Sequence, residues 1–288
     1  MSESFDADWL ELREPFDARA RDFGLALALS AALPARPRLL DLGAGTGSLF
    51  RWLAPVLNRP QAWTLVDADV SLIEFAFDTI AMRAVDVGFE VSAPNKRTLL
   101  VHTPSGAWRV DGLVRDLADA PEGLPLGKAD GVVCSALCDL VSRRWVERMA
   151  EGLRLPFYAA LNVAGDARFL PPHPADGIVA RGFRRDQRRE KGFDGPALGN
   201  EAVRAMAAAF RAQGFDVATA PSPWRIGPAE TRMLSALAKG HTEAARRWTP
   251  RGGAAIGAWS AARAAQARRG ALRALVGHTD LLALPPGR

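Results

Sequence analysis

The sequence predicts a doubly wound α/β fold, in which a mostly parallel, seven-stranded sheet carries helices on both faces. Three observations indicate this class. Short apolar runs alternate with segments of helical periodicity over residues 38–163. A glycine-rich turn joins the first apolar run to the helix that follows it. Finally, 48% of the 288 residues are apolar, which is enough for a large core. We expect one domain over residues 1–288.

The first half of the chain begins with two helices, expected within residues 8–33, because Pro34 and Pro37 cannot continue a helix. Segment 1–35 would form a helical lid. Asp69 is placed to cap the second helix after the glycine turn. The segments then expected are strand 38–42, helix 48–57, strand 62–67, helix 70–87, hairpin 98–114, strand 129–135, helix 143–153 and strand 156–163.

The second half of the chain has two segments that the alternation does not explain. Residues 164–199 lack helical or strand periodicity and are rich in proline and glycine, which indicates a long loop or insertion. Together with residues 225–270, they are expected to form a cap over a substrate. The remaining expected segments are helix 201–213, strand 215–220, helices 228–248 and 253–269, and strand 278–284.

The charge is unevenly distributed along the chain. Residues 1–150 hold 16 Lys and Arg against 21 Asp and Glu, whereas residues 151–288 hold 21 against 11. A basic half can attract anionic substrates or RNA. Arginine outnumbers lysine 33 to 4, however, and a chain rich in Ala, Gly, Pro and Arg can also acquire this charge from a GC-rich coding sequence.

The compartment is expected to be the cytoplasm. No apolar stretch approaches the ~20 residues that a membrane helix needs, and the first eight residues are acidic rather than a basic leader. The two cysteines, Cys134 and Cys138, lie in one apolar segment, as reduced, packed thiols do. No cluster of potential ligands suggests a metal.

A glycine-rich turn occupies the end of the first predicted strand, where residues 39–47 read LLDLGAGTG. Such a turn lets a ligand approach the backbone and directs free N–H groups at it. A dinucleotide site requires a glycine at the sixth position of this motif, and Ser48 stands there instead. A nicotinamide or flavin dinucleotide is therefore disfavoured.

The turn resembles motif I of class I (Rossmann-like) S-adenosylmethionine-dependent methyltransferases, and later segments extend the resemblance. It implies S-adenosyl-L-methionine as the cofactor, with Asp67 binding the ribose hydroxyls and Asp116 the adenine amino group. A carboxylate suits the ribose because it accepts two adjacent hydroxyl donors. The full set of cofactor contacts that the resemblance implies is Asp41, Gly43, Ala44, Gly45, Gly47, Asp67, Ala68, Asp116, Leu117, Cys134 and Ser135.

The helical lid carries a charged cluster over residues 12–19. In many enzymes of this kind the leader folds over the cofactor, so Arg13 or Arg19 could pair with the cofactor's carboxylate. The alternative is a solvated helix face. In the first case, Arg13 is a cofactor-binding residue.

Methyl transfer requires alignment and at most one proton acceptor. His173, among the prolines of the insertion, could be that base or a surface histidine. Tyr158, the only tyrosine, could line the pocket or belong to the core. The motif that similar enzymes use for amide or adenine nitrogens is absent after the fourth strand, since residues 135–138 read SALC.

A basic strip over residues 181–191 bears on the acceptor. Arg184, Arg185 and Arg188 could hold a carboxylate or phosphate of a substrate, follow an RNA backbone, or form a solvated face. Three hypotheses remain open: methyl transfer to a small molecule that could be anionic, methyl transfer to RNA, and cofactor binding without catalysis. The first is favoured because no recognisable RNA-binding module accompanies the strip.

Overall fold

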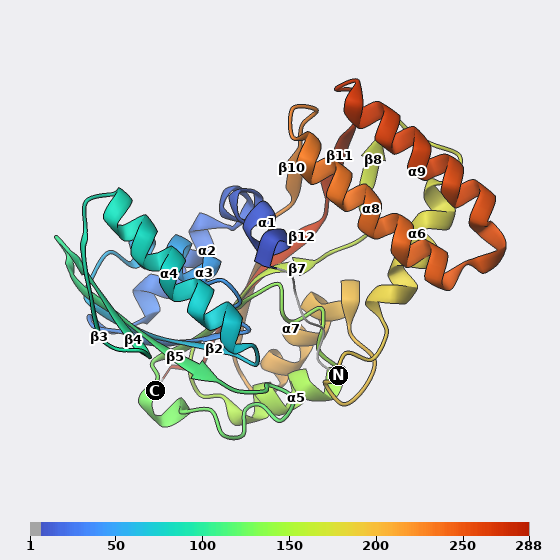
Figure 1. The fold of residues 1–288 in the computed structure, drawn as a ribbon. Coiled ribbons are helices and arrows are strands. Elements are labelled where there is room, and N and C mark those ends of the chain that lie inside the picture. Colours follow the sequence, from blue (N-terminus) through green and yellow to red (C-terminus); the bar gives the residue numbers. More distant parts are fainter. Residues whose placement is uncertain (1–6, 288) are drawn as a thin grey trace.

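The computed structural model describes residues 7–287 and contains a central sheet of nine strands in the order β3-β4-β5-β2-β1-β6-β7-β12-β9 (Figure 1). Strands β5, β2, β1, β6 and β7 are parallel, and β12 runs antiparallel to both β7 and β9. The bounds are β1 Arg38–Leu42, β2 Gln61–Asp67, β3 Glu90–Asn95, β4 Thr98–Thr103, β5 Gly106–Val114, β6 Gly131–Ser135, β7 Phe157–Val163, β9 Asp216–Pro221 and β12 His278–Leu284. The doubly wound α/β class is confirmed.

The expected count of seven strands is wrong, because β3 and β4 extend the sheet beyond β5. The hairpin of β4 and β5 was expected, but β3 was not. All six residues of β3 are exposed or half-buried, so this edge strand lacks the apolar alternation that marks a half-buried strand. The sheet is mixed, and its parallel part is the region predicted to be parallel.

Helices cover both faces of the central sheet, and each face has its own apolar core. On one face, α5 and α7 pack against the strands. On the other face, α2, α3 and α4 do so. The helices of the described chain are α1 Ala7–Ala20, α2 Phe23–Ala32, α3 Ser48–Leu57, α4 Val70–Asp86, α5 Arg143–Gly152, α6 Asp176–Gln187, α7 Ala202–Ala212, α8 Thr231–Trp248 and α9 Gly253–Arg268, with short 3-10 turns at Leu126–Lys128, Gly199–Glu201 and Pro250–Gly252. Asp69 caps α4 as predicted, since its side chain accepts the Ser71 N–H at 2.8 Å.

A second, three-stranded sheet lies beside the central one, in the order β10-β11-β8. Its strands are β8 Arg168–Leu170, β10 Trp224–Ile226 and β11 Arg273–Val276. We call these strands, together with α6, α8 and α9, the cap. The cap has a separate apolar cluster, which Phe16 of α1 joins. Figure 1 shows α1 between the central sheet and the cap.

The expectation that residues 164–199 lack regular structure is wrong, because they contain β8 and α6. Only Val179 and Gly182 are buried among the twelve residues of α6, so the helix shows little apolar periodicity. A Cβ added at Gly182 would lie 2.6 Å from the Ala245 Cα atom, so the glycine permits close packing of α6 against α8. Glycine lowers helix propensity, which weakens the sequence signal further.

No helix within residues 7–287 combines the length and apolar character needed to cross a bilayer.

Candidate cofactor site

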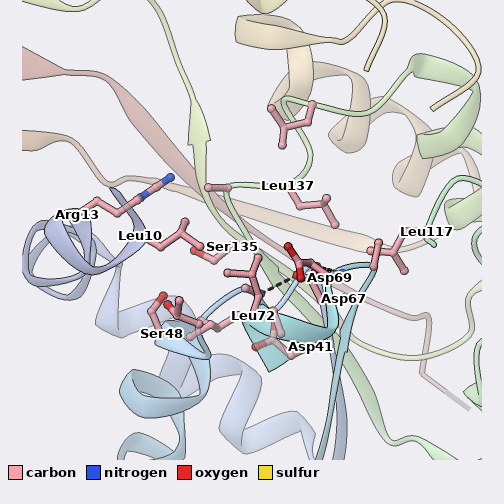
Figure 2. A pocket seen from close by; sticks show the side chains of 18 of the residues that line it. Leu10, Arg13, Asp41, Ser48, Asp67, Asp69, Leu72, Leu117, Ser135 and Leu137 are labelled. Atoms are coloured by element: carbon pink, nitrogen blue, oxygen red, sulfur yellow. Dashed lines mark hydrogen bonds between the residues drawn. The ribbon is translucent and has the colours of Figure 1, made fainter. Parts of the chain in front are cut away.

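A pocket of about 430 Å³ opens at the carboxyl ends of β1, β2 and β6. Its walls come from the turns that follow these strands, from the turn after β5, from α1 and from Lys191 and Phe193. Figure 2 shows side chains converging on the pocket from α1 and from the segments that follow β1, β2, β5 and β6. Ligands of open α/β sheets commonly bind at this edge of the sheet.

The glycine turn forms the floor of the pocket, and its conformation explains its composition. Gly43, Gly45 and Gly47 have φ angles of +62°, +52° and +77°, a region that strongly favours glycine. Gly43, Ala44 and Gly45 line the pocket. Gly47, also an expected cofactor contact, does not line the pocket. It precedes Ser48, the first residue of α3, which does, so the amino end of that helix faces the pocket.

Asp67 at the end of β2 is bonded to the glycine turn. Its Oδ2 atom accepts the Gly45 N–H at 2.8 Å, and its Oδ1 atom accepts the Asp69 N–H at 3.0 Å. Burial raises the pKa of Asp67, and these two amide donors oppose the rise. Each carboxylate oxygen has a second lone pair, so Asp67 can still accept two hydroxyl groups from a ligand in the pocket.

Asp41 at the end of β1 is a buried carboxylate that lines the pocket. It is 1% exposed, and its Oδ2 atom has no hydrogen-bond partner among the described residues. Burial raises the pKa of Asp41 from 3.8 to about 8; Asp67 adds to the rise, and Arg21 opposes it. A buried acceptor without a partner is costly, and a cationic ligand group in the pocket would remove that cost.

Arg21, between α1 and α2, lies behind the pocket and organises two of its walls. Its side chain is fully buried and donates to the hydroxyls of Ser48 and Ser135, both at 3.1 Å. Both serines line the pocket. Because each hydroxyl oxygen accepts from Arg21, each retains its own hydrogen for a ligand acceptor. Arg21 was not among the residues predicted from the sequence, since an arginine that follows a charged helix is usually solvated.

Arg13 of α1 also lines the pocket. Its guanidinium donates to both oxygens of Asp17, at 3.0 and 3.3 Å, and lies over the Trp224 ring at 5.0 Å. The other candidate on this helix, Arg19, pairs with Glu230 and is not a pocket residue. Of the two candidate arginines, only Arg13 therefore lies at the pocket.

The opposite end of the pocket is more apolar. Asp116 and Leu117 line it as expected, together with Leu137, Leu140 and Phe193. The Asp116 Oδ1 atom accepts the Ala118 N–H at 2.9 Å, which fixes the turn after β5. These side chains form a slot suited to a flat aromatic group with a polar edge.

Several predicted site residues lie outside the pocket. Cys134 is fully buried in the core, with its Sγ atom 3.6 Å from Cys138 Sγ. The Cys138 thiol and burial raise the pKa of Cys134 well above its ordinary value. Both Cys134 and Ser135 were expected at the cofactor, but only Ser135 lines the pocket.

The two expected catalytic residues also lie elsewhere, and neither is assigned a role in catalysis. Tyr158 is fully buried, and its hydroxyl donates to Asp280 at 3.1 Å; burial and Asp280 raise its pKa. His173 belongs to the turn that begins α6, where its Nδ1 atom accepts the Ala175 N–H at 3.1 Å. Neither residue lines the pocket.

The basic strip contributes a different cation from those expected. Arg184 pairs with Asp166, and Arg185 and Arg188 are exposed on and after α6. None of the three lines the pocket, whereas the buried Lys191 does. Within residues 7–287, no group of three or more His, Cys, Asp or Glu side chains could hold a metal ion.

No family model matches the sequence, and no curated protein matches it either. Among solved structures, a putative type II methyltransferase from Anaeromyxobacter dehalogenans is 20% identical, with a TM-score of 0.46 over 93% of this chain and 98% of its own. An S-adenosylmethionine-dependent methyltransferase from Geobacter sulfurreducens, bound to S-adenosyl-L-homocysteine, is 19% identical, with a TM-score of 0.42 over 91% and 90%.

A third solved structure is phosphoethanolamine N-methyltransferase 2 from Haemonchus contortus, which is 11% identical, with a TM-score of 0.45 over 98% of this chain and 59% of that protein. At these identities and TM-scores, the three structures carry no argument about activity, so the function of this chain is inferred from its own pocket.

Proposed function

We propose that the chain binds S-adenosyl-L-methionine in this pocket and transfers its methyl group to a small molecule. The observation that carries the proposal is the division of the pocket into three chemically distinct parts. One end combines Asp41 with the two serines held by Arg21, the middle holds Asp67, and the other end is an apolar slot. These parts match, in order, an amino acid, a ribose and an adenine.

The amino-acid end of the pocket combines an acidic side chain with hydrogen-bond donors and an arginine. Asp41 would accept an α-ammonium group, while the Ser48 and Ser135 hydroxyls and the guanidinium of Arg13 would donate to the carboxylate. The amino end of α3 adds a favourable field for the carboxylate. Charged hydrogen bonds of this kind contribute about 1.5–3 kcal/mol each when they are shielded from water.

The other two parts hold the nucleoside. Asp67 would accept the two ribose hydroxyls, and its bonds to the glycine turn already fix the carboxylate in place. Leu117, Leu137 and Phe193 would enclose the adenine ring, with Asp116 at its amino edge. A site whose acceptors are fixed before binding loses little conformational entropy when the ligand arrives.

The bound cofactor would supply an electrophilic methyl group on a sulfonium centre. The chain's task is then to align the acceptor with the methyl–sulfur bond and to exclude water. We assign to the cap and α1 the role of closing the acceptor side, because Arg13 of α1 contacts both the pocket and Trp224 of the cap. The Lys191 ammonium at the pocket makes an acceptor with a carboxylate or phosphate group the preferred class.

The proposal is tested by incubating the protein with methyl-labelled cofactor and fractionated cell extract. Label in a small-molecule fraction is expected. Label in RNA would replace the small-molecule hypothesis, and label in no fraction, despite measurable cofactor binding, would indicate a binding protein without this activity.

A second experiment tests the assignment of the amino-acid end. S-adenosylhomocysteine and 5′-methylthioadenosine share the nucleoside, but only the first has an amino-acid group. Ser135→Ala and Arg21→Lys are expected to lower the affinity for S-adenosylhomocysteine at least about fivefold, which corresponds to the loss of roughly one hydrogen bond. The affinity for 5′-methylthioadenosine should not change. Equal weakening of both ligands would show that these variants disturb the whole pocket instead.

A further inference from the structure

A second cavity, of about 770 Å³, lies between α1, α3, α4 and the β4–β5 hairpin. It is distinct from the cofactor pocket, although Ser48 at the start of α3 lines both. The role proposed for the first pocket makes no use of this cavity.

Four aromatic side chains contribute to the walls of the second cavity. Phe50, Trp52, Phe89 and Trp108 line it, and the Trp108 ring meets Phe50 and Phe89 edge to face, at centroid distances of 6.2 and 6.0 Å. Trp108 is 7% exposed, and its indole N–H has no hydrogen-bond partner among the described residues. Most buried donors in proteins are paired, so the unpaired N–H of Trp108 is an exception in this wall.

Charge also favours a particular class of ligand. Arg51, Arg83 and Glu14 line the cavity, which gives one positive charge in excess. Glu14 and Arg51 form an ion pair at 2.5 Å, with both side chains largely buried. Arg83 is exposed on α4, at the mouth of the cavity. Aromatic walls and a surplus arginine together suit a flat ring that carries an anionic group.

Arg51 connects this cavity to the cofactor pocket. Its Nη1 atom donates to the Thr46 carbonyl oxygen in the glycine turn, while its Nη2 atom binds Glu14 on α1. One guanidinium therefore ties the turn beneath the cofactor to the helix that lines the pocket's other side. A ligand anion that separates Arg51 from Glu14 would change both the ion pair with Glu14 and the hydrogen bond to Thr46.

We propose that the second cavity is a regulatory site for a small aromatic anion, such as an aryl carboxylate or sulfonate, and that Arg51 transmits its binding to the glycine turn. The binding step is independent of the function proposed above. Only the consequence for cofactor affinity depends on that function.

Binding is tested with 8-anilinonaphthalene-1-sulfonate, an aromatic sulfonate whose fluorescence rises in apolar sites. Arg83→Glu should weaken it at least tenfold, whereas Arg97→Glu, an equal charge change in the exposed β3–β4 turn outside the cavity, should not. Ala84→Trp, which fills the cavity, should also abolish binding, while Val85→Trp on the outer side of α4, 60% exposed, should leave it intact.

Unchanged binding in both Arg83→Glu and Ala84→Trp would overturn the proposal, since the dye would then occupy another place. The two variants act by charge and by volume, so a folding defect in Ala84→Trp leaves Arg83→Glu to decide.

Transmission is tested by amide hydrogen exchange with and without the dye. Exchange at residues 43–51 should change at least threefold on binding in the wild-type chain and should not change in Arg51→Gln. No change in the wild-type chain would refute the regulatory role. Neither measurement uses the cofactor, so absence of S-adenosylhomocysteine binding would count against the proposed function alone.

Discussion

Replacing Asp41 with asparagine should stabilise the protein and weaken its ligand binding, because the carboxylate is buried and its own Oδ2 atom has no hydrogen-bond partner among the described residues. Burial raises its pKa from 3.8 to about 8. The folded state thus favours the protonated form, and ionisation of Asp41 destabilises it. Below pH 3.8 the carboxyl group is protonated in both the folded and the unfolded state, so it does not lower the free energy of unfolding. The cost grows by about 1.4 kcal/mol per pH unit and levels off above pH 8, at roughly 5–6 kcal/mol if nothing relaxes.

Asparagine has nearly the shape of the protonated acid and never ionises. The stability difference between Asp41→Asn and wild type should therefore be small at pH 4 and favour the variant by at least about 2 kcal/mol at pH 8, after allowance for relaxation around the charge. Urea unfolding of both proteins at pH 4, 6 and 8 measures this difference in the free energy of unfolding. Asp130→Asn, at an exposed ion pair with Arg38, serves as the control. A difference that does not grow with pH would refute the reasoning.

Three further substitutions test the assignments of individual residues. Arg13→Ala should weaken S-adenosylhomocysteine severalfold by calorimetry, and an unchanged dissociation constant would remove Arg13 from the site. Gly47→Ala should destabilise the fold by about 1–2 kcal/mol, because alanine is strained at φ +77°; an unchanged melting temperature would contradict the strained turn. Tyr158→Phe should cost about 1 kcal/mol through the lost bond to Asp280, with ligand affinity unchanged; a fall in affinity would return Tyr158 to the site.

The sequence was most informative where local patterns and the fold agree. The helix expected at 48–57 is α3, because its apolar residues recur on one face and Gly47 ends the preceding turn. The strands at 38–42 and 278–284 also have the expected bounds, since both consist largely of buried residues.

The cap was not predictable in the same way. Strands β8, β10 and β11 have only three or four residues each, too few to show an alternation. They pair across long separations in sequence, with β8 bonded to β11 about a hundred residues later. Neither feature leaves a local signal, so these three strands were not predicted, whereas the helices expected at 228–248 and 253–269 are α8 and α9 of the cap.

The site shows a similar division. The glycine turn and Asp67 could be predicted because their spacing follows the chain from strand to helix to strand. Arg21 and Lys191 could not, because their place depends on how the lid and the segment after α6 fold back on the pocket. His173 was predicted as a possible base because of its residue type, but its contacts are local: it stabilises the turn before α6.

The central claim is that the pocket at the ends of β1 and β2 binds S-adenosylmethionine through Asp67. It is tested most directly by calorimetric titration of S-adenosylhomocysteine into the wild-type chain, Asp67→Asn and the control Asp130→Asn. The account predicts one site in the wild type and in the control, and at least about tenfold weaker binding in Asp67→Asn, which loses one of the two acceptors for the ribose. Equal affinity in all three proteins, or no binding to the wild type at about 1 mM ligand, would contradict it.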